Sequence, residues 1–297
     1  MEHNHSHTIT SPININRSFI IGISLNVIYV IVEIIYGFRA NSTALLSDAA
    51  HNVGDISGLL LAFVAYKLQV IKPSKLFSYG FKKGSILASF INSVLLAFAI
   101  GAIAWEGVHK ILNPTPLSGT LIMWVAGIGV IINFISAMLF RKNQERDLNI
   151  KAAYWHLMAD AMVSLGVVAS GILIYYFQWY ALDGITAIII AFVVLFSTWR
   201  LFKDSAIAIL DGVPVSVDPE EIKEHLMSVE GVINVHHMHI WGLSTNENSL
   251  TAHIQIADTT KLPEIKNALK AELTEHNIKH STLEFELATE ECKETDL

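Results

Sequence analysis

Six long apolar stretches constrain this chain more than any other feature of its sequence. They run roughly over residues 18–38, 45–66, 84–105, 117–140, 152–177 and 182–199. Each is close to the ~20 residues that an α-helix needs to cross the hydrocarbon core of a bilayer. Only 16% of the residues are charged, against about 25% in a typical soluble domain. The sequence therefore predicts an integral membrane protein with a bundle of six transmembrane helices.

The basic residues predict how these spans are oriented. Six spans place both termini on the same side of the membrane. Five lysines lie between the second and third spans, and further basic residues lie between the fourth and fifth spans and after the sixth. The loops on the opposite side carry only Arg39 and Lys110. Because cytoplasmic loops carry the excess of Lys and Arg, we expect both termini to be cytoplasmic.

Charge also divides the chain into two regions. From residue 204 onward there are 18 acidic and 6 basic residues, whereas the part before it has 9 acidic and 14 basic residues. We therefore expect a membrane domain at 17–203 and an acidic cytoplasmic domain at 204–290. The ends, 1–16 and 291–297, are expected to be disordered tails. The acidic balance argues against a nucleic-acid partner, which requires a cationic surface.

The acidic region has the pattern of a small two-layer domain. A helix start at Asp218 and Pro219 is followed by a stop at Gly231. Alternating segments typical of strands lie at 232–241, 249–257 and 281–288. A second helical pattern precedes the last of these segments. The order helix–strand–strand–helix–strand predicts an α+β domain.

Two matched His-xxx-Asp motifs lie within the apolar stretches. The second stretch contains SDAAHNVGD, with His51 and Asp55, and the fifth contains AYWHLMADAM, with His156 and Asp160. A separation of four residues puts both members of a pair on one helix face. Two facing pairs supply the two nitrogens and two oxygens that a tetrahedral Zn²⁺ site needs. Because an unpartnered Asp at the centre of a membrane helix costs ~2.5–3.5 kcal/mol, a bound cation is the expected partner.

Other interpretations of the polar residues stay open. The His and Asp pairs could bond neighbouring helices instead, as polar side chains do in membranes, although their repetition on two helices favours a metal site. For Glu33, Asn92 and Asp183 we favour helix packing or an interfacial position over a ligand role. The single cysteine, Cys292, excludes an intramolecular disulfide and a Cys-rich metal site.

The segments that carry these motifs resemble the cation diffusion facilitator family over nearly the whole chain. The similar segments are NSTALLSDAAHNVGD, KPSKLFSYGFKKGSILASFIN, AAYWHLMADAMVSLGV, VHHMHIW and LTAHIQI. The resemblance implies six transmembrane helices with a cytoplasmic ferredoxin-like domain, working as a homodimer that exchanges metal for protons. The two His-xxx-Asp pairs resemble those of the zinc-transporting branch.

The resemblance also implies a regulatory metal site in the cytoplasmic domain. It points to His236, His253 and Glu286 at the dimer interface, and surface or strand-packing histidines are the alternative. Strand alternation predicts that His236 and His239 lie on opposite faces. The loop KLQVIKPSKLFSYGF has no His or Asp, so the loop metal site of some relatives cannot form there. The N-terminal tail holds three further histidines, His3, His5 and His7. They could collect metal weakly or be dispensable.

These features together predict proton-coupled efflux of a divalent transition metal, with Zn²⁺ favoured, by alternating access. Metal binding requires neutral imidazoles, so protons compete for the site. Zn²⁺ is then the transported substrate and a possible regulatory ligand, and we expect no cofactor. The short loops favour a bacterial cytoplasmic membrane.

Two other classes of function were weighed. A catalytic zinc site keeps an open coordination position for water, whereas four protein ligands close the shell here, so we do not expect an intramembrane metalloenzyme. A membrane metal sensor that signals through the cytoplasmic domain stays as the alternative, although it leaves a ligand cage in the middle of the membrane unexplained.

Overall fold

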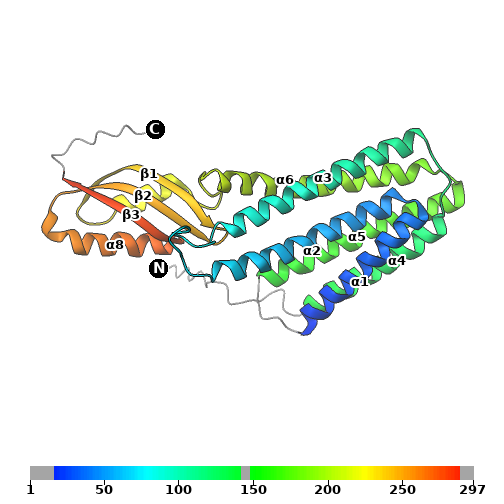
Figure 1. Cartoon of the computed structure of the whole chain (residues 1–297), viewed down its shortest axis with the longest axis horizontal. Helices are drawn as coiled ribbons and strands as arrows, with labels where there is room; N and C mark the ends of the chain where they lie inside the picture. The colour runs from blue at the N-terminus through cyan, green and yellow to red at the C-terminus, as the bar shows by residue number, and fades with distance from the viewer. Residues whose placement is uncertain (1–16, 142–147, 288–297) are drawn as a thin grey trace, which may run out of the picture. The chain divides into compact units, whose positions relative to one another are not determined.

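Six long helices precede a small sheet domain in the computed structural model, which describes residues 17–141 and 148–287 (Figure 1). The helices are α1 (Arg17–Ala40), α2 (Thr43–Gln69), α3 (Gly84–Leu112), α4 (Gly119–Phe140), α5 (Leu148–Phe177) and α6 (Ala181–Ile209). They overlap the six apolar stretches, and α6 continues past the end expected at residue 199. The expected tails, with the N-terminal histidines and Cys292, lie outside the described residues.

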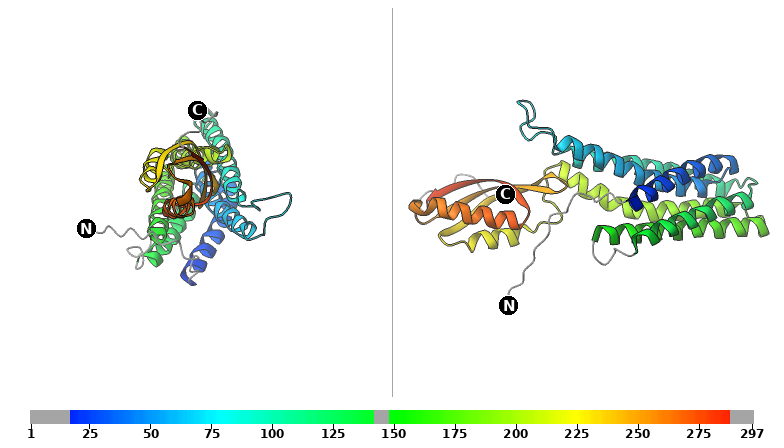
Figure 2. Two further views of the ribbon diagram at one scale, coloured as in Figure 1. Left: turned by 90° about the vertical axis from the view of Figure 1, so that its left-hand side faces the viewer. Right: turned by 90° about the horizontal axis from the view of Figure 1, so that it is seen from below.

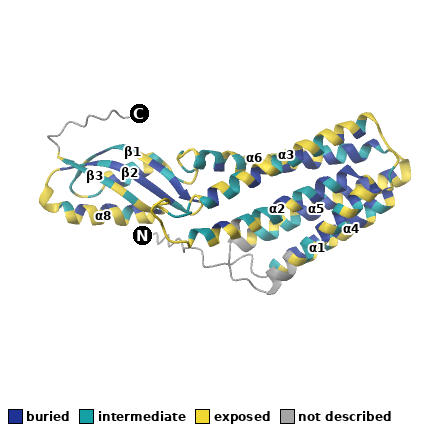
Figure 3. Ribbon diagram, in the orientation of Figure 1, coloured by how far each residue is buried: buried dark blue, intermediate teal, exposed yellow. Residues whose placement is uncertain are grey.

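The long helices carry exposed residues along their length (Figure 3), and many of these residues are large and apolar. Phe98, Trp105 and Phe196 are 81%, 76% and 80% exposed. Soluble monomers rarely expose wide apolar surfaces, whereas lipid covers such surfaces in a membrane. Among the described residues, α3, α4, α5 (over Ala153–Phe177) and α6 are long and apolar enough to cross a membrane, by length and composition alone. The chain therefore contains a helical membrane domain.

The chain forms two compact units. They comprise residues 1–56 with 98–195, and residues 57–97 with 196–297. In the first unit, helices approach closely where glycines face each other. A Cβ added to Gly119 of α4 would come 2.6 Å from the carbonyl oxygen of Gly171 in α5, and one added to Gly184 of α6 would come 2.5 Å from that of Gly107 in α3. Small residues of this kind let membrane helices pack tightly.

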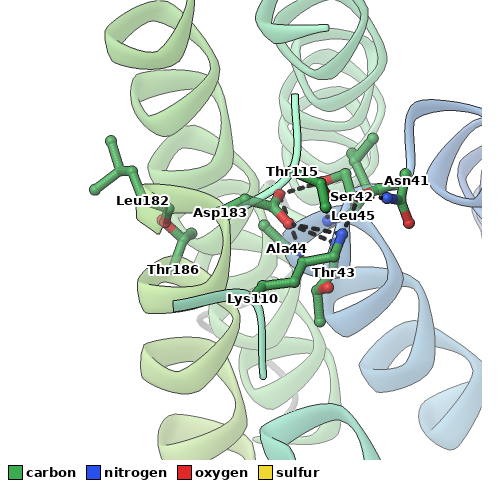
Figure 4. Close-up of polar contacts among 10 residues, drawn as sticks. All are labelled: Asn41, Ser42, Thr43, Ala44, Leu45, Lys110, Thr115, Leu182, Asp183 and Thr186. Atoms are coloured by element: carbon green, nitrogen blue, oxygen red, sulfur yellow. Dashed lines mark hydrogen bonds and ion pairs between the residues drawn. The ribbon is translucent and has the colours of Figure 1, made fainter. Parts of the chain in front are cut away.

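A buried carboxylate, that of Asp183 near the start of α6, holds the beginning of α2 (Figure 4). Its Oδ1 accepts a hydrogen bond from Ser42 Oγ (2.5 Å), and its Oδ2 accepts one from the backbone N–H of Thr43 (2.7 Å). Lys110 of α3 supplies the opposite charge, with Nζ 3.5 Å from Asp183 Oδ2, and donates to the carbonyl of Asn41. Asp183 therefore has a role in helix packing, as we expected from the sequence. Lys110, which we counted as a loop residue, is a buried partner within α3.

The C-terminal part of the chain is an α+β domain with a three-stranded sheet. Its elements are α7 (Pro219–Met227), β1 (Val232–Ser244), β2 (Glu247–Ile256), a short 3₁₀ helix (Thr259–Lys261), α8 (Leu262–Glu275) and β3 (Ile278–Leu287). β1 pairs antiparallel with β2, and β2 pairs parallel with β3. The predicted order of helices and strands is confirmed. Leu226 of α7 and Leu269 of α8 share one core with Val235 and Ile254 of the sheet, so one face of the sheet is covered by both helices.

Two lysines tie the segment between α2 and α3 to the sheet domain. Nζ of Lys82 lies 2.8 and 2.9 Å from the two carboxylate oxygens of Glu247, the first residue of β2. Nζ of Lys83 lies 2.5 Å from Oδ1 of Asp211, just after α6. The lysine-rich segment and the sheet domain are therefore in direct contact.

We expect Asp183→Ala to destabilise the protein strongly. The substitution leaves Lys110 charged and buried beside unpaired N–H groups of α2, and removing one partner of a buried ion pair costs about 3–5 kcal/mol. Thermal unfolding of the detergent-solubilised protein measures the loss. Asp204→Ala, at a carboxylate of α6 that is 38% exposed, is the matched control. A second change, Lys110→Met, should recover part of the loss. An unchanged melting temperature in Asp183→Ala would contradict this role.

Candidate metal centre

Four side chains of α2 and α5 form a closed ring of alternating imidazole and carboxylate groups. His51 Nε2 lies 3.8 Å from Asp55 Oδ2 and 3.3 Å from Asp160 Oδ1. His156 Nε2 lies 3.2 Å from Asp55 Oδ2 and 3.6 Å from Asp160 Oδ2. Each carboxylate thus contacts one histidine of its own helix and one of the other helix. We call these four side chains the transport ring, after the role that the sequence led us to expect for them.

The dimensions of the transport ring suit a tetrahedral metal ion. Zinc bonds of about 2.0–2.2 Å to nitrogen and oxygen put neighbouring ligand atoms roughly 3.3–3.6 Å apart, and the four edges measured here are 3.2–3.8 Å. The ligand atoms of His51, Asp55 and Asp160 all lie within 4.8 Å of one another. His156 lies farther from His51, with 6.0 Å between their ring centroids. Three of the four side chains therefore meet closely enough to hold one ion, and His156 lies beside them, 3.2 Å from Asp55.

The transport ring is closed on one side and open on the other. The side chains of His51 and Asp160 are 13% and 5% exposed, whereas those of Asp55 and His156 are 32% and 46% exposed. Nδ1 of His51 is buried and makes no hydrogen bond to any described residue. His51 and Asp160 therefore form the buried side of the ring, and Asp55 and His156 form its accessible side.

A second polar contact joins α2 and α5 about one helical turn from the ring. Ser164 Oγ donates a hydrogen bond of 2.8 Å to Asp48 Oδ2, and both residues are fully buried. Asp48 precedes His51 by three residues and Ser164 follows Asp160 by four, so both lie on the helix faces that carry the ring. We did not predict this contact. The four-residue spacing that located the ring could also have pointed to Ser164, which follows Asp160 by four residues.

Asn92 makes a contact typical of helix packing, as we favoured, whereas the contact of Glu33 lies within its own helix. Tyr29 OH donates to Glu33 Oε1 at 2.7 Å within α1. Ser57 Oγ of α2 donates to Asn92 Oδ1 of α3 at 2.8 Å. Neither residue is among the described groups of side chains whose ligand atoms meet closely enough to hold a metal ion.

A second cluster, which we call the sheet cluster, lies on the sheet face opposite to α7 and α8. His253 Nδ1 lies 2.7 Å from Glu286 Oε1, and His236 Nε2 lies 3.2 Å from Glu286 Oε2. The three side chains are 10–12% exposed. Both ring nitrogens of His236 and Oε2 of Glu286 make no hydrogen bond to any described residue. Such buried atoms cost about 1–3 kcal/mol each, and a cation between them would satisfy both groups.

A β-bulge in β1 shows that the predicted faces of its histidines were wrong. The β1–β2 register pairs His236 with His253 and His239 with Thr251. Three steps along β1 therefore match two along β2. The extra residue shifts the alternation, so His236 and His239 lie on the same face. His237 sits in this irregular stretch with a φ of 47°, and its ring centroid lies 4.9 Å from that of His253.

Comparisons with known proteins match both parts of the chain. Residues 19–210 match the model of the cation efflux transmembrane domain, and residues 214–286 match that of the cytoplasmic domain of cation efflux proteins. The zinc transporter ZitB of Escherichia coli strain K12 is 31% identical over 96% of this chain and 93% of the relative. The metal cation efflux system protein CzcD of Cupriavidus metallidurans is 34% identical over 99% and 92%. The cadmium, cobalt and zinc/H(+)-K(+) antiporter of Bacillus subtilis is 33% identical over 87% and 85%.

We expect Zn²⁺ to raise the melting temperature of the protein through the sheet cluster. A free ion concentration of about 100 times the Kd stabilises the folded state by about 2.7 kcal/mol. The measurement is thermal unfolding with and without Zn²⁺ in an Asp160→Asn background, which disables the transport ring. Glu286→Gln should reduce the shift. Glu264→Gln, the same change at an exposed side chain of α8, should keep it. Equal zinc shifts in the two variants would leave the sheet cluster without a metal.

Proposed function

The chain belongs to the cation efflux family, the cation diffusion facilitators, and we propose that it exports a divalent transition metal, mainly Zn²⁺, in exchange for protons. The transport ring is the observation that supports this proposal most directly. Four residues, His51, Asp55, His156 and Asp160, bind the ion as it crosses the membrane. Zn²⁺ is the transported substrate.

The ligand set solves the problem of carrying a divalent ion through a medium of low dielectric constant. Zn²⁺ must lose its water shell, and an uncompensated charge in such a medium costs tens of kcal/mol by idealised Born solvation. The two imidazole nitrogens and two carboxylate oxygens replace that shell. The two carboxylates also cancel both charges of the ion. The ion and its four ligands together therefore form a neutral group within the membrane.

The ligands come from two helices, and this arrangement supports alternating access. His51 and Asp55 move with α2, whereas His156 and Asp160 move with α5. A relative movement of the two helices separates the ring into two halves and releases the ion. Protons compete with the ion because only neutral imidazoles bind metal. The name of the Bacillus subtilis relative describes an antiporter of cadmium, cobalt and zinc against H⁺ and K⁺.

We extend the proposal to the topology of the chain. All six long helices cross the membrane, and both termini lie in the cytoplasm. The ion pairs of Lys82 with Glu247 and of Lys83 with Asp211 support this orientation, because they keep a lysine-rich segment beside the sheet domain. The named relatives come from bacteria, which supports a bacterial cytoplasmic membrane.

The domain at 204–290 is proposed to be ferredoxin-like and to pair with a second copy of the chain. Metal at His236, His253 and Glu286 regulates this pairing. The sheet face that carries these residues is free of α7 and α8. Two strongly acidic domains repel each other, and a divalent cation bound at that face offsets part of the repulsion. The membrane domain occupies 17–203, although α6 itself continues to Ile209.

Reconstituted protein distinguishes this proposal from its alternatives. A transporter moves Zn²⁺ into proteoliposomes when a pH gradient is imposed, whereas a metal sensor binds the ion without flux. A metalloenzyme would need an open coordination position for water, which four protein ligands do not leave. Zinc binding with no flux under any gradient would favour the sensor.

Removing either carboxylate of the transport ring should abolish transport. We expect zinc flux in Asp55→Asn and in Asp160→Asn proteoliposomes to fall to the level of empty vesicles, because the remaining carboxylate balances only one charge of the ion. Asp204→Asn, the same change outside the ring, should transport normally. The variants should reconstitute in equal amounts. Near-normal flux in both ring variants would disprove the proposed path of the ion.

Zinc affinity at the ring should fall as the pH falls. Imidazole has a reference pKa of about 6.5, and each histidine that gains a proton ceases to be a ligand. With two histidines, log Kd should change by up to about two units per pH unit below that range. His156→Asp should halve this slope. Isothermal titration from acid to neutral pH measures the slope, with His253→Ala, Glu286→Gln and His276→Gln present so that the histidine clusters of the sheet domain do not contribute. An affinity that does not change with pH would exclude proton exchange at this ring.

A further inference from the structure

Three side chains able to bind metal meet on the helix layer of the sheet domain. His225 lies in the last turn of α7, Glu272 lies near the end of α8, and His276 follows α8 as its C-cap. His225 Nδ1 lies 2.7 Å from Glu272 Oε1. His276 Nε2 lies 3.1 Å from His225 Nδ1 and 3.6 Å from Glu272 Oε1. We call these three side chains the helix cluster.

We propose that the helix cluster binds one divalent transition-metal ion, with Zn²⁺ the best fit. Two imidazole nitrogens and one carboxylate oxygen are donors that Zn²⁺ accepts. One ligand atom from each side chain lies within 4.8 Å of the other two, so small side-chain rotations bring all three to one ion. The fourth tetrahedral position stays open to water, which lets the ion exchange.

The surroundings of the helix cluster favour a cation. α7 and α8 both end at the cluster, and each helix C-terminus carries a partial negative charge of roughly half a unit. Glu221 and Glu224 of α7 add further negative charge near His225. This negative potential stabilises a divalent ion.

The helix cluster is separate from the two clusters described above. It lies on the layer of α7 and α8, whereas the sheet cluster lies on the opposite face of the sheet. His225, Glu272 and His276 are 43%, 29% and 22% exposed, against 10–12% for the sheet cluster. An ion here is therefore more accessible to the surrounding solvent. The inference does not depend on the transport function of the membrane domain.

A metal ion at the helix cluster would act as a clamp within one protomer. It would join the end of α7 to the end of α8, two helices that already pack in one core with the sheet and share the His225–Glu272 contact. His276 is two residues before β3, the strand that carries Glu286. Binding would therefore also restrain the start of the strand that supplies a carboxylate to the sheet cluster.

The competing explanation is a contact between α7 and α8 that needs no metal. The rings of His225 and His276 meet edge to face with centroids 4.6 Å apart, and Glu272 accepts a hydrogen bond from His225 without an ion. Substitutions would destabilise the domain under either explanation. Only a metal site makes zinc binding itself depend on these three residues.

Zinc stoichiometry in the full-length protein tests the proposal. The background carries Asp160→Asn, His253→Ala and alanine at the three N-terminal histidines, so that the other candidate sites are disabled. We expect equilibrium dialysis to find one Zn²⁺ per chain, and Glu272→Gln or His276→Gln to raise its Kd at least tenfold. Glu275→Gln, the same charge change at an exposed neighbour on α8, should leave the Kd unchanged. Equal Kd values in Glu272→Gln and Glu275→Gln would overturn the proposal.

A second measurement needs no variant and covers the case in which the substitutions unfold the domain. Diethyl pyrocarbonate modifies free imidazoles, and peptide mass spectrometry reports each histidine separately. We expect Zn²⁺ to slow the modification of His225 and His276 in the parent protein at least severalfold. His280, exposed on the same domain, should react at one rate throughout. Unchanged reactivity of His225 and His276 in saturating Zn²⁺ would overturn the proposal.

Discussion

The carboxylate of Asp183 determines where α2 begins, and the transport ring depends on where α2 begins. His51 lies eight residues after Thr43, about 12 Å along the helix axis at 1.5 Å per residue. The hydrogen bonds from Ser42 and Thr43 to Asp183 fix the first turn of α2 against α6. Asp183 and Lys110 are both buried, so a slip of α2 along its axis would leave a buried charge and free N–H groups unsatisfied.

The transport ring could be predicted from the sequence because its geometry is mostly local. A separation of four residues fixes His51 and Asp55 on one helix face whatever the helix packs against, and the same holds for His156 and Asp160. The ion pair of Lys110 with Asp183 is different, since 73 residues separate its members. The neighbouring residues in the sequence do not indicate that a lysine at the end of an apolar stretch has a buried partner beside it. Counting charges assigned Lys110 to a loop for this reason.

The sheet domain shows the same division between local and tertiary information. Alternation located all three strands and their order, because it reflects which face each residue buries. It failed at His236 and His239, because a single extra residue in β1 changes the face of everything after it. The helix cluster had no sequence signal of its own. His225 and His276 meet only because α7 and α8 end side by side on the sheet.

The three clusters differ in how freely their ligands can move apart, and this difference fits their proposed roles. In the sheet cluster, the ladder hydrogen bonds of β1, β2 and β3 fix the ligand-bearing backbone, so no small motion releases an ion. In the transport ring, each half belongs to a different helix, and no backbone hydrogen bond joins α2 to α5 at this point. A shift of one helix away from the other by an ångström or two would lengthen the contacts of His51 with Asp160 and of His156 with Asp55. It would leave the contacts within each helix unchanged. A carrier needs a site of this second kind, because an ion that can be bound but not released is not transported.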